Sequence, residues 1–161
     1  MIPVCDLCDA HPDAVRVLDP VFQSFGGVRS FHGRAETIRT HEDNSRVREA
    51  VAEPGEGRVL VIDGGGSLKR SLFGGNLAAQ AAENGWAGVI VYGAVRDVHE
   101  LEAEALGVLA LGLCPVKTEK RGLGERGPVL GIAGAVIAPG DWIYADRDGV
   151  IASADALHEK T

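Results

Sequence analysis

The sequence contains few aromatic residues, few cysteines and no long apolar run. Aromatic residues occupy 5% of the 161 positions, and the three cysteines are an odd number, which indicates free thiols rather than a disulfide framework. No apolar run approaches the ~20 residues needed to cross a bilayer, and the residues after Met1 open no signal peptide. We therefore expect a soluble, cytoplasmic protein with reduced cysteines.

Basic residues are also scarce. The chain has 16 lysines and arginines against 23 aspartates and glutamates, a formal net charge of −7. Its densest basic stretch, residues 117–126, is interrupted by acidic residues and glycines. A nucleic-acid-binding protein usually carries a basic stripe that neutralises phosphates. We therefore expect no direct contact with RNA or DNA and no membrane partner, whereas a protein partner stays open.

The residues that are present fit one aliphatic α/β domain, residues 1–161 with a short tail from about residue 153. Apolar runs bounded by turn residues predict buried strands, and 3.6-residue spacing predicts helices between them. The core unit comprises strands at 58–62, 89–92 and 108–113, with helices at 76–84 and 97–105. The flanking elements are a helix at 6–10 with Asp6 as its N-cap, a strand over 28–40, a helix from the capping residues 41–45 to residue 52, and strands at 128–132, 135–138, 142–145 and 150–152. This order predicts a parallel βαβ core packed on a mainly antiparallel β layer.

A glycine-rich turn, Gly64–Gly66, follows the first buried strand. The position three residues after Gly66 is Lys69, so the G-x-G-x-x-G dinucleotide fingerprint is absent, and no Gly-Lys-Ser/Thr follows either. A tight turn with positive φ angles explains these glycines without a nucleotide. A methyltransferase is the weakest interpretation, because no cofactor-binding glycine motif of the expected form is present.

Two loops of the βαβ unit carry the candidate chemistry. Strand–helix–strand units are right-handed with parallel strands, so loops 63–76 and 93–100 open at one sheet edge, where α/β proteins bind ligands. The first supplies a helix N-terminus at Gly75–Leu77, which favours an anion. The second supplies Arg96, a two-pronged carboxylate partner, and Asp97, a hard oxygen ligand. We expect a site for a small carboxylate that chelates a divalent ion; the alternative is a helix cap with a solvated neighbour.

A set of motifs recurs in order along nearly the whole chain, to about residue 152. They are Asp6-Leu7-Cys8-Asp9, Phe25-Gly26-Gly27, Glu42-Asp43-Asn44, the segment Val61 to Leu68, the segment Gly74 to Ala78 and the segment Tyr92 to Asp97. With these motifs the sequence resembles the RraA-like family. That family comprises regulators of ribonuclease activity and class II 4-hydroxy-4-methyl-2-oxoglutarate aldolases, and its members were once labelled demethylmenaquinone methyltransferases.

The resemblance implies a swivelling β/β/α-type domain assembled into homotrimers, or dimers of trimers, with sites near subunit boundaries. It also implies roles for the two loops: pyruvate binding by the backbone of the helix start, a catalytic arginine and aspartate, and a Mg²⁺ or Mn²⁺ ion on the aspartate. These roles fall to Gly74, Gly75, Asn76 and Leu77 for the substrate, to Arg96 for substrate and catalysis, to Asp97 for catalysis and metal, and to Glu100 as a candidate metal ligand through water. Aldolase-type members can carry aspartate where this chain has Gly75, which leaves efficient carbon–carbon cleavage open.

Two functions follow as hypotheses. The first is a divalent-metal-dependent lyase of the 4-hydroxy-4-methyl-2-oxoglutarate aldolase or oxaloacetate decarboxylase type, which releases pyruvate through a stabilised enolate. The second is a non-catalytic regulator that inhibits ribonuclease E activity by protein–protein contact, a role in which an acidic surface suits a basic partner.

Other residues have ordinary explanations. Cys5, Cys8 and His11 have metal-like spacing, but no fourth ligand is apparent, so idle or buried thiols are the simpler interpretation. The remaining candidates are Lys69 as an exposed charge, His99 as a solvated helix residue, Glu42 to Asn44 as a helix start, and Trp86 and Trp142 as core or subunit contacts.

Overall fold

The computed structural model describes residues 1–158. The helices are α1 (Val4–Ala10), α2 (Ser45–Val51), α3 (Gly75–Glu83) and α4 (Val98–Glu102). The strands are β1 (Arg16–Val17), β2 (Gln23–Ser24), β3 (Phe31–Arg39), β4 (Val59–Asp63), β5 (Ser71–Phe73), β6 (Gly88–Val95), β7 (Gly107–Leu113), β8 (Glu125–Arg126), β9 (Leu130–Ile132), β10 (Ala135–Ile137), β11 (Trp142–Ala145) and β12 (Val150–Ser153). Among these residues, no helix is long and apolar enough to span a membrane.

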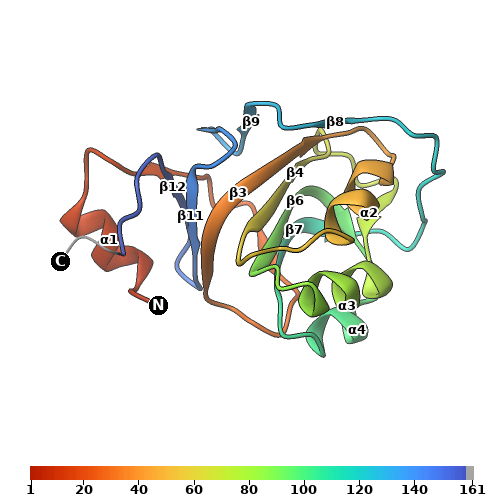
Figure 1. The fold of residues 1–161 in the computed structure, drawn as a ribbon, viewed down its shortest axis with the longest axis horizontal. Coiled ribbons are helices and arrows are strands. Elements are labelled where there is room, and N and C mark those ends of the chain that lie inside the picture. Colours follow the sequence, from red (N-terminus) through yellow and green to blue (C-terminus); the bar gives the residue numbers. More distant parts are fainter. Residues whose placement is uncertain (159–161) are drawn as a thin grey trace.

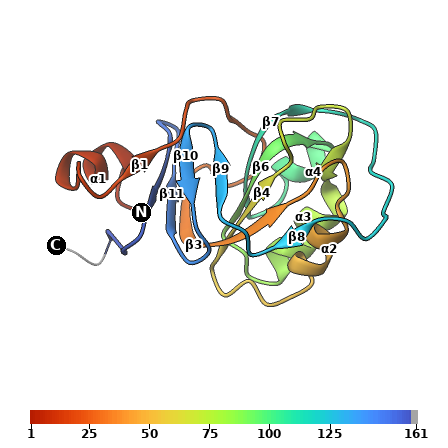
Figure 2. The same cartoon turned by 90° about the horizontal axis from the view of Figure 1, so that it is seen from above.

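The elements form layers (Figures 1 and 2). Helices α2, α3 and α4 cover one face of the parallel strands, the antiparallel strands lie on the other face, and α1 lies beyond them. The strand order β1-β12-β11-β3-β4-β6-β7-β2 combines both kinds of pairing. Strands β3, β4, β6 and β7 are mutually parallel, whereas β11 and β12 are antiparallel to their neighbours. The mixed α/β fold predicted from the sequence is therefore confirmed.

Strand β3 belongs to both layers. Its first half pairs with β11, from Phe31 opposite Ala145 to Arg34 opposite Trp142, and its second half pairs with β4 from Ala35 opposite Val59 onward. A single nine-residue strand therefore carries the chain from the antiparallel layer into the parallel sheet.

The parallel strands are buried on both faces, as their continuous apolar runs predict. Side chains alternate along β4: Leu60 and Ile62 face the core under the helices, while Val59 and Val61 face the core between the two β layers. All four side chains are 0% exposed. Both cores therefore fix the position of β4, and with it the loop that follows.

Three sequence expectations need correction. The first helix begins at Val4 with Pro3 as its N-cap, so Asp6 lies inside the first turn instead of capping it. The helix expected at 97–105 is only α4, because Asp97 is its N-cap with a left-handed backbone (φ 64°) and the helix already ends at Glu102. The stretch between Ser67 and Gly74, where no element was expected, contains β5, which pairs with the end of β6.

Candidate active site

The two loops expected to share a sheet edge do meet there. Strands β4 and β6 are parallel, with Asp63 opposite Tyr92, so the loops that follow the two strands leave the sheet at the same edge. Beyond that point the Arg96 N–H donates to the Phe73 oxygen at 3.0 Å, which ties the end of β6 to the last residue of β5, just before the N-cap of α3. The backbone alone therefore brings residues 96 and 97 beside the glycine turn.

Helix α3 begins at a crowded point, where a larger residue than glycine would press on the neighbouring side chains. A Cβ atom on Gly74 would lie 2.7 Å from Asp97 Oδ2 and 3.2 Å from Arg96 Cγ. The Gly75 N–H is donated to Asp97 Oδ2 at 2.9 Å. Among the described residues, the next two amides, Asn76 and Leu77, donate to no acceptor. Free N–H groups at the positive end of a helix dipole form a site for an anion.

Asp97 is held in an uncommon conformation. Its φ of 64° lies in the left-handed region, which costs a non-glycine residue about 1–2 kcal/mol, although aspartate tolerates it better than most. The conformation turns the carboxylate back toward α3, where Oδ2 also lies 3.9 Å from Arg96 Nε. The side chains of Arg96 and Asp97 are 38% and 39% exposed, so both remain accessible to a ligand.

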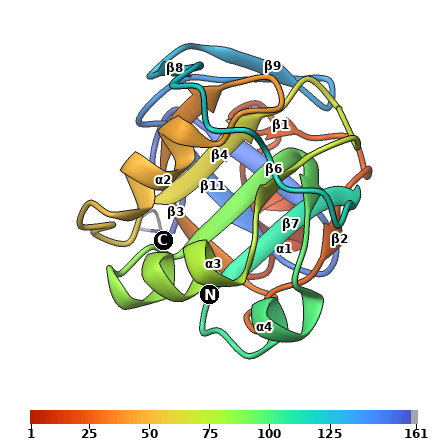
Figure 3. The same ribbon diagram turned by 90° about the vertical axis from the view of Figure 1, so that its right-hand side faces the viewer.

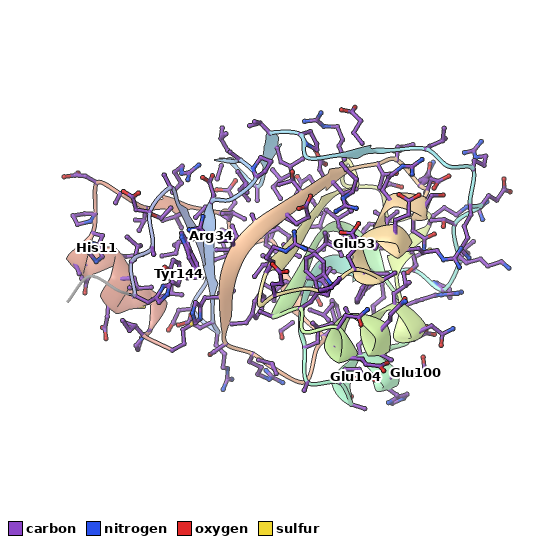
Figure 4. All side chains as sticks on the ribbon, in the orientation of Figure 1. His11, Arg34, Glu53, Glu100, Glu104 and Tyr144 are labelled. Carbon is purple, nitrogen blue, oxygen red and sulfur yellow. The ribbon has the colours of Figure 1, made fainter. Side chains whose placement is uncertain are left out.

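These groups line one pocket of about 230 Å³. This volume is slightly below the ~300–1,000 Å³ of most ligand sites, so it suits a small metabolite better than a nucleotide. The structure brings together the residues that sequence analysis proposed: Gly74, Gly75, Asn76, Leu77, Arg96 and Asp97. Glu100 does not line the pocket. It lies on α4 (Figure 4), and its side chain packs so closely against Gly75 that a Cβ atom on Gly75 would overlap Glu100 Oε2 and lie 2.8 Å from the Glu100 Cβ.

Sequence analysis missed the other wall of the pocket. Its further lining residues include Asn44, Arg48, Gln80, Lys117, Thr118 and Lys120. In the sequence, the basic stretch that starts at Lys117 signals at most a nucleic-acid surface. Thr118 Oγ1 donates to Asn44 Oδ1 at 2.8 Å across 74 positions of sequence, a contact that no local pattern signals.

A strap formed by residues 114–124 crosses the carboxyl ends of the strands and completes this wall (Figure 3). The fully buried carboxylate of Asp43 anchors the strap, because it accepts the Arg121 N–H at 2.6 Å and the Ser45 N–H at 2.8 Å. Burial acts to raise the pKa of Asp43, but hydrogen bonds from Ser45, Arg121 and Leu123 outweigh it and hold that pKa below its usual value. Asp43 therefore stays charged at neutral pH and fixes the strap as well as the start of α2.

The donor set fits a divalent ion that is shared with a substrate. Within residues 1–158, no three histidine, cysteine, aspartate or glutamate side chains are grouped to hold a metal on their own. Asp97 offers a single carboxylate, with Oδ2 occupied by the Gly75 N–H and Oδ1 free of hydrogen-bond donors from the described chain. Mg²⁺ is commonly held by one or two carboxylates together with water and substrate oxygens. Asp97 meets that requirement, whereas a structural zinc site would need more ligands.

The other candidates lie outside this pocket. Both thiols of the first helix hold their protons at neutral pH, because the Asp148 carboxylate raises the pKa of Cys5 and burial raises the pKa of Cys8. Trp86 is buried and donates its ring N–H to the Glu53 oxygen at 3.2 Å, as a core residue does. Lys69 and His99 are exposed and do not line the pocket.

Comparison with known proteins gives the family. Residues 4–152 match the RraA-like family, described as Aldolase/RraA. The chain is 53% identical over 156 residues to a protein of Alkalilimnicola ehrlichii named "Putative 4-hydroxy-4-methyl-2-oxoglutarate aldolase", with 97% of each chain covered. The chain therefore belongs to the RraA-like family, as its motifs indicated.

Two solved structures share the fold. One is the RNA-processing inhibitor RraA from Thermus thermophilis, with a TM-score of 0.93 and 46% identity over 96% of this chain and 94% of that one. The other, from Geobacillus kaustophilus, is titled S-adenosylmethionine: 2-dimethylmenaquinone methyltransferase; its TM-score is 0.95 and its identity 44%, with 99% of both chains covered. The names in this family thus include lyases, regulators and a methyltransferase, so function has to be argued from the site.

Proposed function

We propose that the protein is a divalent-metal-dependent lyase that cleaves short 2-oxo acids and releases pyruvate. One observation carries the proposal: the unpaired amides of the α3 start, the Arg96 guanidinium and the Asp97 carboxylate line a single small pocket. These groups complement a 2-oxo acid, whose carboxylate is an anion and whose adjacent carbonyl oxygen is an electron-rich ligand.

The positively charged groups of the site would bind the substrate carboxylate, and its negatively charged group would bind the metal ion. The Asn76 and Leu77 amides and the Arg96 guanidinium would hold the substrate carboxylate. The Asp97 Oδ1 atom would hold Mg²⁺ or Mn²⁺, which as a Lewis acid stabilises negative charge on the 2-oxo oxygen by several kcal/mol. The Gly75 N–H fixes Asp97 in place before substrate arrives, so no binding energy is spent on orienting it.

The reaction that this arrangement favours leaves a carbanion beside the 2-oxo group. In 4-hydroxy-4-methyl-2-oxoglutarate the 4-hydroxyl loses its proton, a carbonyl forms at C4 and the C3–C4 bond breaks. The electron pair passes to C3 and spreads onto the 2-oxo oxygen as the enolate of pyruvate, which takes up a proton at C3. Loss of CO₂ from oxaloacetate gives the same enolate, so one site serves both reactions.

The test is pyruvate release from 4-hydroxy-4-methyl-2-oxoglutarate and from oxaloacetate, followed with a lactate dehydrogenase coupling assay. We expect turnover with Mg²⁺ or Mn²⁺, loss of turnover with excess chelator, and no turnover in Asp97→Ala. Equal inertness of wild type and Asp97→Ala toward both substrates would refute the lyase.

A second candidate function is inhibition of an RNA-processing enzyme by protein contact, favoured by the 46% identity to the Thermus inhibitor. It predicts that the purified protein lowers ribonuclease E cleavage of a model RNA, and that Asp97→Ala does so equally well. Both functions are compatible with a homotrimer, which we propose because three apolar side chains around the end of β7, Leu68, Leu113 and Val116, are 44–50% exposed. Sedimentation equilibrium measures this assembly directly.

A further inference from the structure

The segment after β12, residues 154–158, is held against the outer face of the antiparallel layer. Leu157 is 1% exposed and packs in one apolar cluster with Leu7 of α1 and Tyr144 of β11. Figure 1 shows this end of the chain beside α1, on the side of the fold away from helices α2, α3 and α4. None of these residues lines the proposed active site, so their contacts are open to a different role.

The buried hydroxyl of Tyr144 makes two polar contacts with this segment. It accepts the Leu157 N–H at 2.7 Å and lies 2.7 Å from His158 Nδ1. A phenol has one proton to donate and the Leu157 amide can only donate, so the Tyr144 proton is available for His158 Nδ1. His158 Nδ1 is then the acceptor, which requires a neutral imidazole with its proton on Nε2.

A second imidazole, that of His32 on β3, lies beside the first. The ring centroids of His32 and His158 are 4.8 Å apart, and the His32 ring also stacks on Tyr144 with an interplanar angle of 5°. Burial, followed by the positive charges of His158 and of the Met1 amino group, lowers the pKa of His32 below its usual value. His32 therefore resists protonation as long as the segment covers it.

The elements packed around the two rings bring few negative charges to them. The charged and titratable groups on these elements are the Met1 amino group, Cys8, Arg34, Tyr144, Asp146 and Asp155. Arg34 lies over the Trp142 ring, 4.9 Å from its centroid, while Asp146 accepts the Val4 N–H at 2.8 Å. The Cys8 thiol stays uncharged because burial raises its pKa. Protonation of the two histidines therefore adds positive charge beside an arginine and an amino group.

We infer that His32 and His158 form a pH-dependent latch that holds the 154–158 segment on the fold at neutral pH and releases it in acid. Protonation turns His158 Nδ1 into a donor, so the Tyr144 hydroxyl faces two N–H groups and its own proton loses its acceptor. Protonation of both histidines also places two positive charges on rings 4.8 Å apart. The latch is independent of the proposed function, because it uses no residue that lines the pocket.

Hydrogen–deuterium exchange of the intact protein, read by mass spectrometry, measures how firmly the segment is held. Since the pKa of His32 is lowered in the closed state, the latch is complete above the ordinary histidine pKa of about 6.5 and weakens as the pH falls below it. One histidine that stays neutral when covered disfavours the closed state by up to about 30-fold at pH 5. With exchange times scaled to the intrinsic amide rate, we expect the protection of residues 154–158 to fall about tenfold or more from pH 7.5 to pH 5. The peptide that contains β4 should keep its protection.

Two variants assign the effect to the histidines. His158→Asn keeps an acceptor for the Tyr144 hydroxyl but cannot be charged, so its segment should stay protected at pH 5. His99→Asn is the matched control, because it removes an exposed histidine on α4 and should behave as the wild type does. A wild type equally protected at both pH values, an undiminished loss in His158→Asn, or a parallel loss in the β4 peptide overturns the latch.

A His158→Asn protein that is unprotected at both pH values passes the decision to His32→Asn. This variant removes the second charge and leaves the Tyr144 contact with His158 in place. A pH-dependent loss of protection that is several-fold smaller than in the wild type supports the latch, and a loss of the same size overturns it.

Discussion

Replacing Gly74 with alanine tests how tightly the proposed catalytic groups are placed. A Cβ atom there would lie 2.7 Å from Asp97 Oδ2, and ordinary contact begins at 3.4 Å, so the carboxylate has to retreat by about 0.7 Å. The backbone of Gly74 is extended (φ −147°), so alanine adopts it without strain. Displacements near 1 Å at a catalytic group cost about 100-fold, and we therefore expect kcat/KM for pyruvate release to fall ten- to a hundredfold.

The Tm of Gly74→Ala shows whether the fall in kcat/KM comes from a displaced carboxylate or from unfolding. Alanine for glycine at a helix N-cap costs about 1 kcal/mol, which lowers Tm by roughly 2–4 °C in a chain of this length. Gly131→Ala is the control, because a Cβ atom there meets nothing within 4 Å. A folded Gly74→Ala protein with the kcat/KM of Gly131→Ala and of wild type would refute the placement of Asp97 against the α3 start.

Two further predictions follow from the site and its support. Arg96→Lys keeps the charge but loses the two-pronged guanidinium, so the inhibition constant of pyruvate should rise about tenfold; an unchanged constant contradicts a direct carboxylate contact. Asp43→Asn should lower the free energy of unfolding by about 1–3 kcal/mol at pH 7, because two backbone N–H groups lose a charged acceptor. Since the folded-state pKa of Asp43 is depressed, its contribution is complete above the ordinary aspartate pKa and disappears as the pH falls below about 4. Urea denaturation at pH 7 and pH 3 should therefore show the gap between wild type and Asp43→Asn closing in acid, and a gap of constant size would contradict the anchoring role.

Local patterns in the sequence are sufficient to predict the parallel strands of the fold. Continuous apolar runs such as Val59 to Ile62 can be buried on both faces only between two layers, and the handedness of βαβ units then sets the sheet edge. The same rule predicts that Arg96 and Asp97 lie beside the α3 start. What it could not give is the left-handed backbone of Asp97, which makes this residue the N-cap of α4 instead of its first helical residue.

The second wall of the pocket was beyond local reasoning. It depends on Asp43 holding Arg121 and on Asn44 holding Thr118, contacts between segments more than 70 residues apart. Such contacts leave no periodicity in the sequence. From the sequence alone, Asp43 cannot be distinguished from an ordinary residue at a helix start. Arg48 and Lys120 likewise line the same pocket only because the strap lies across the strand ends.

The central claim is that the α3 start, Arg96 and Asp97 form one site for a carboxylate and a cation together. Titration of oxalate, a stable mimic of the pyruvate enolate, tests it most directly when carried out with and without Mg²⁺ on wild type and Asp97→Asn. We predict that Mg²⁺ strengthens oxalate binding to the wild type at least tenfold and has little effect on Asp97→Asn. Oxalate binding that ignores Mg²⁺ in the wild type, or an equal gain in both proteins, would contradict the account.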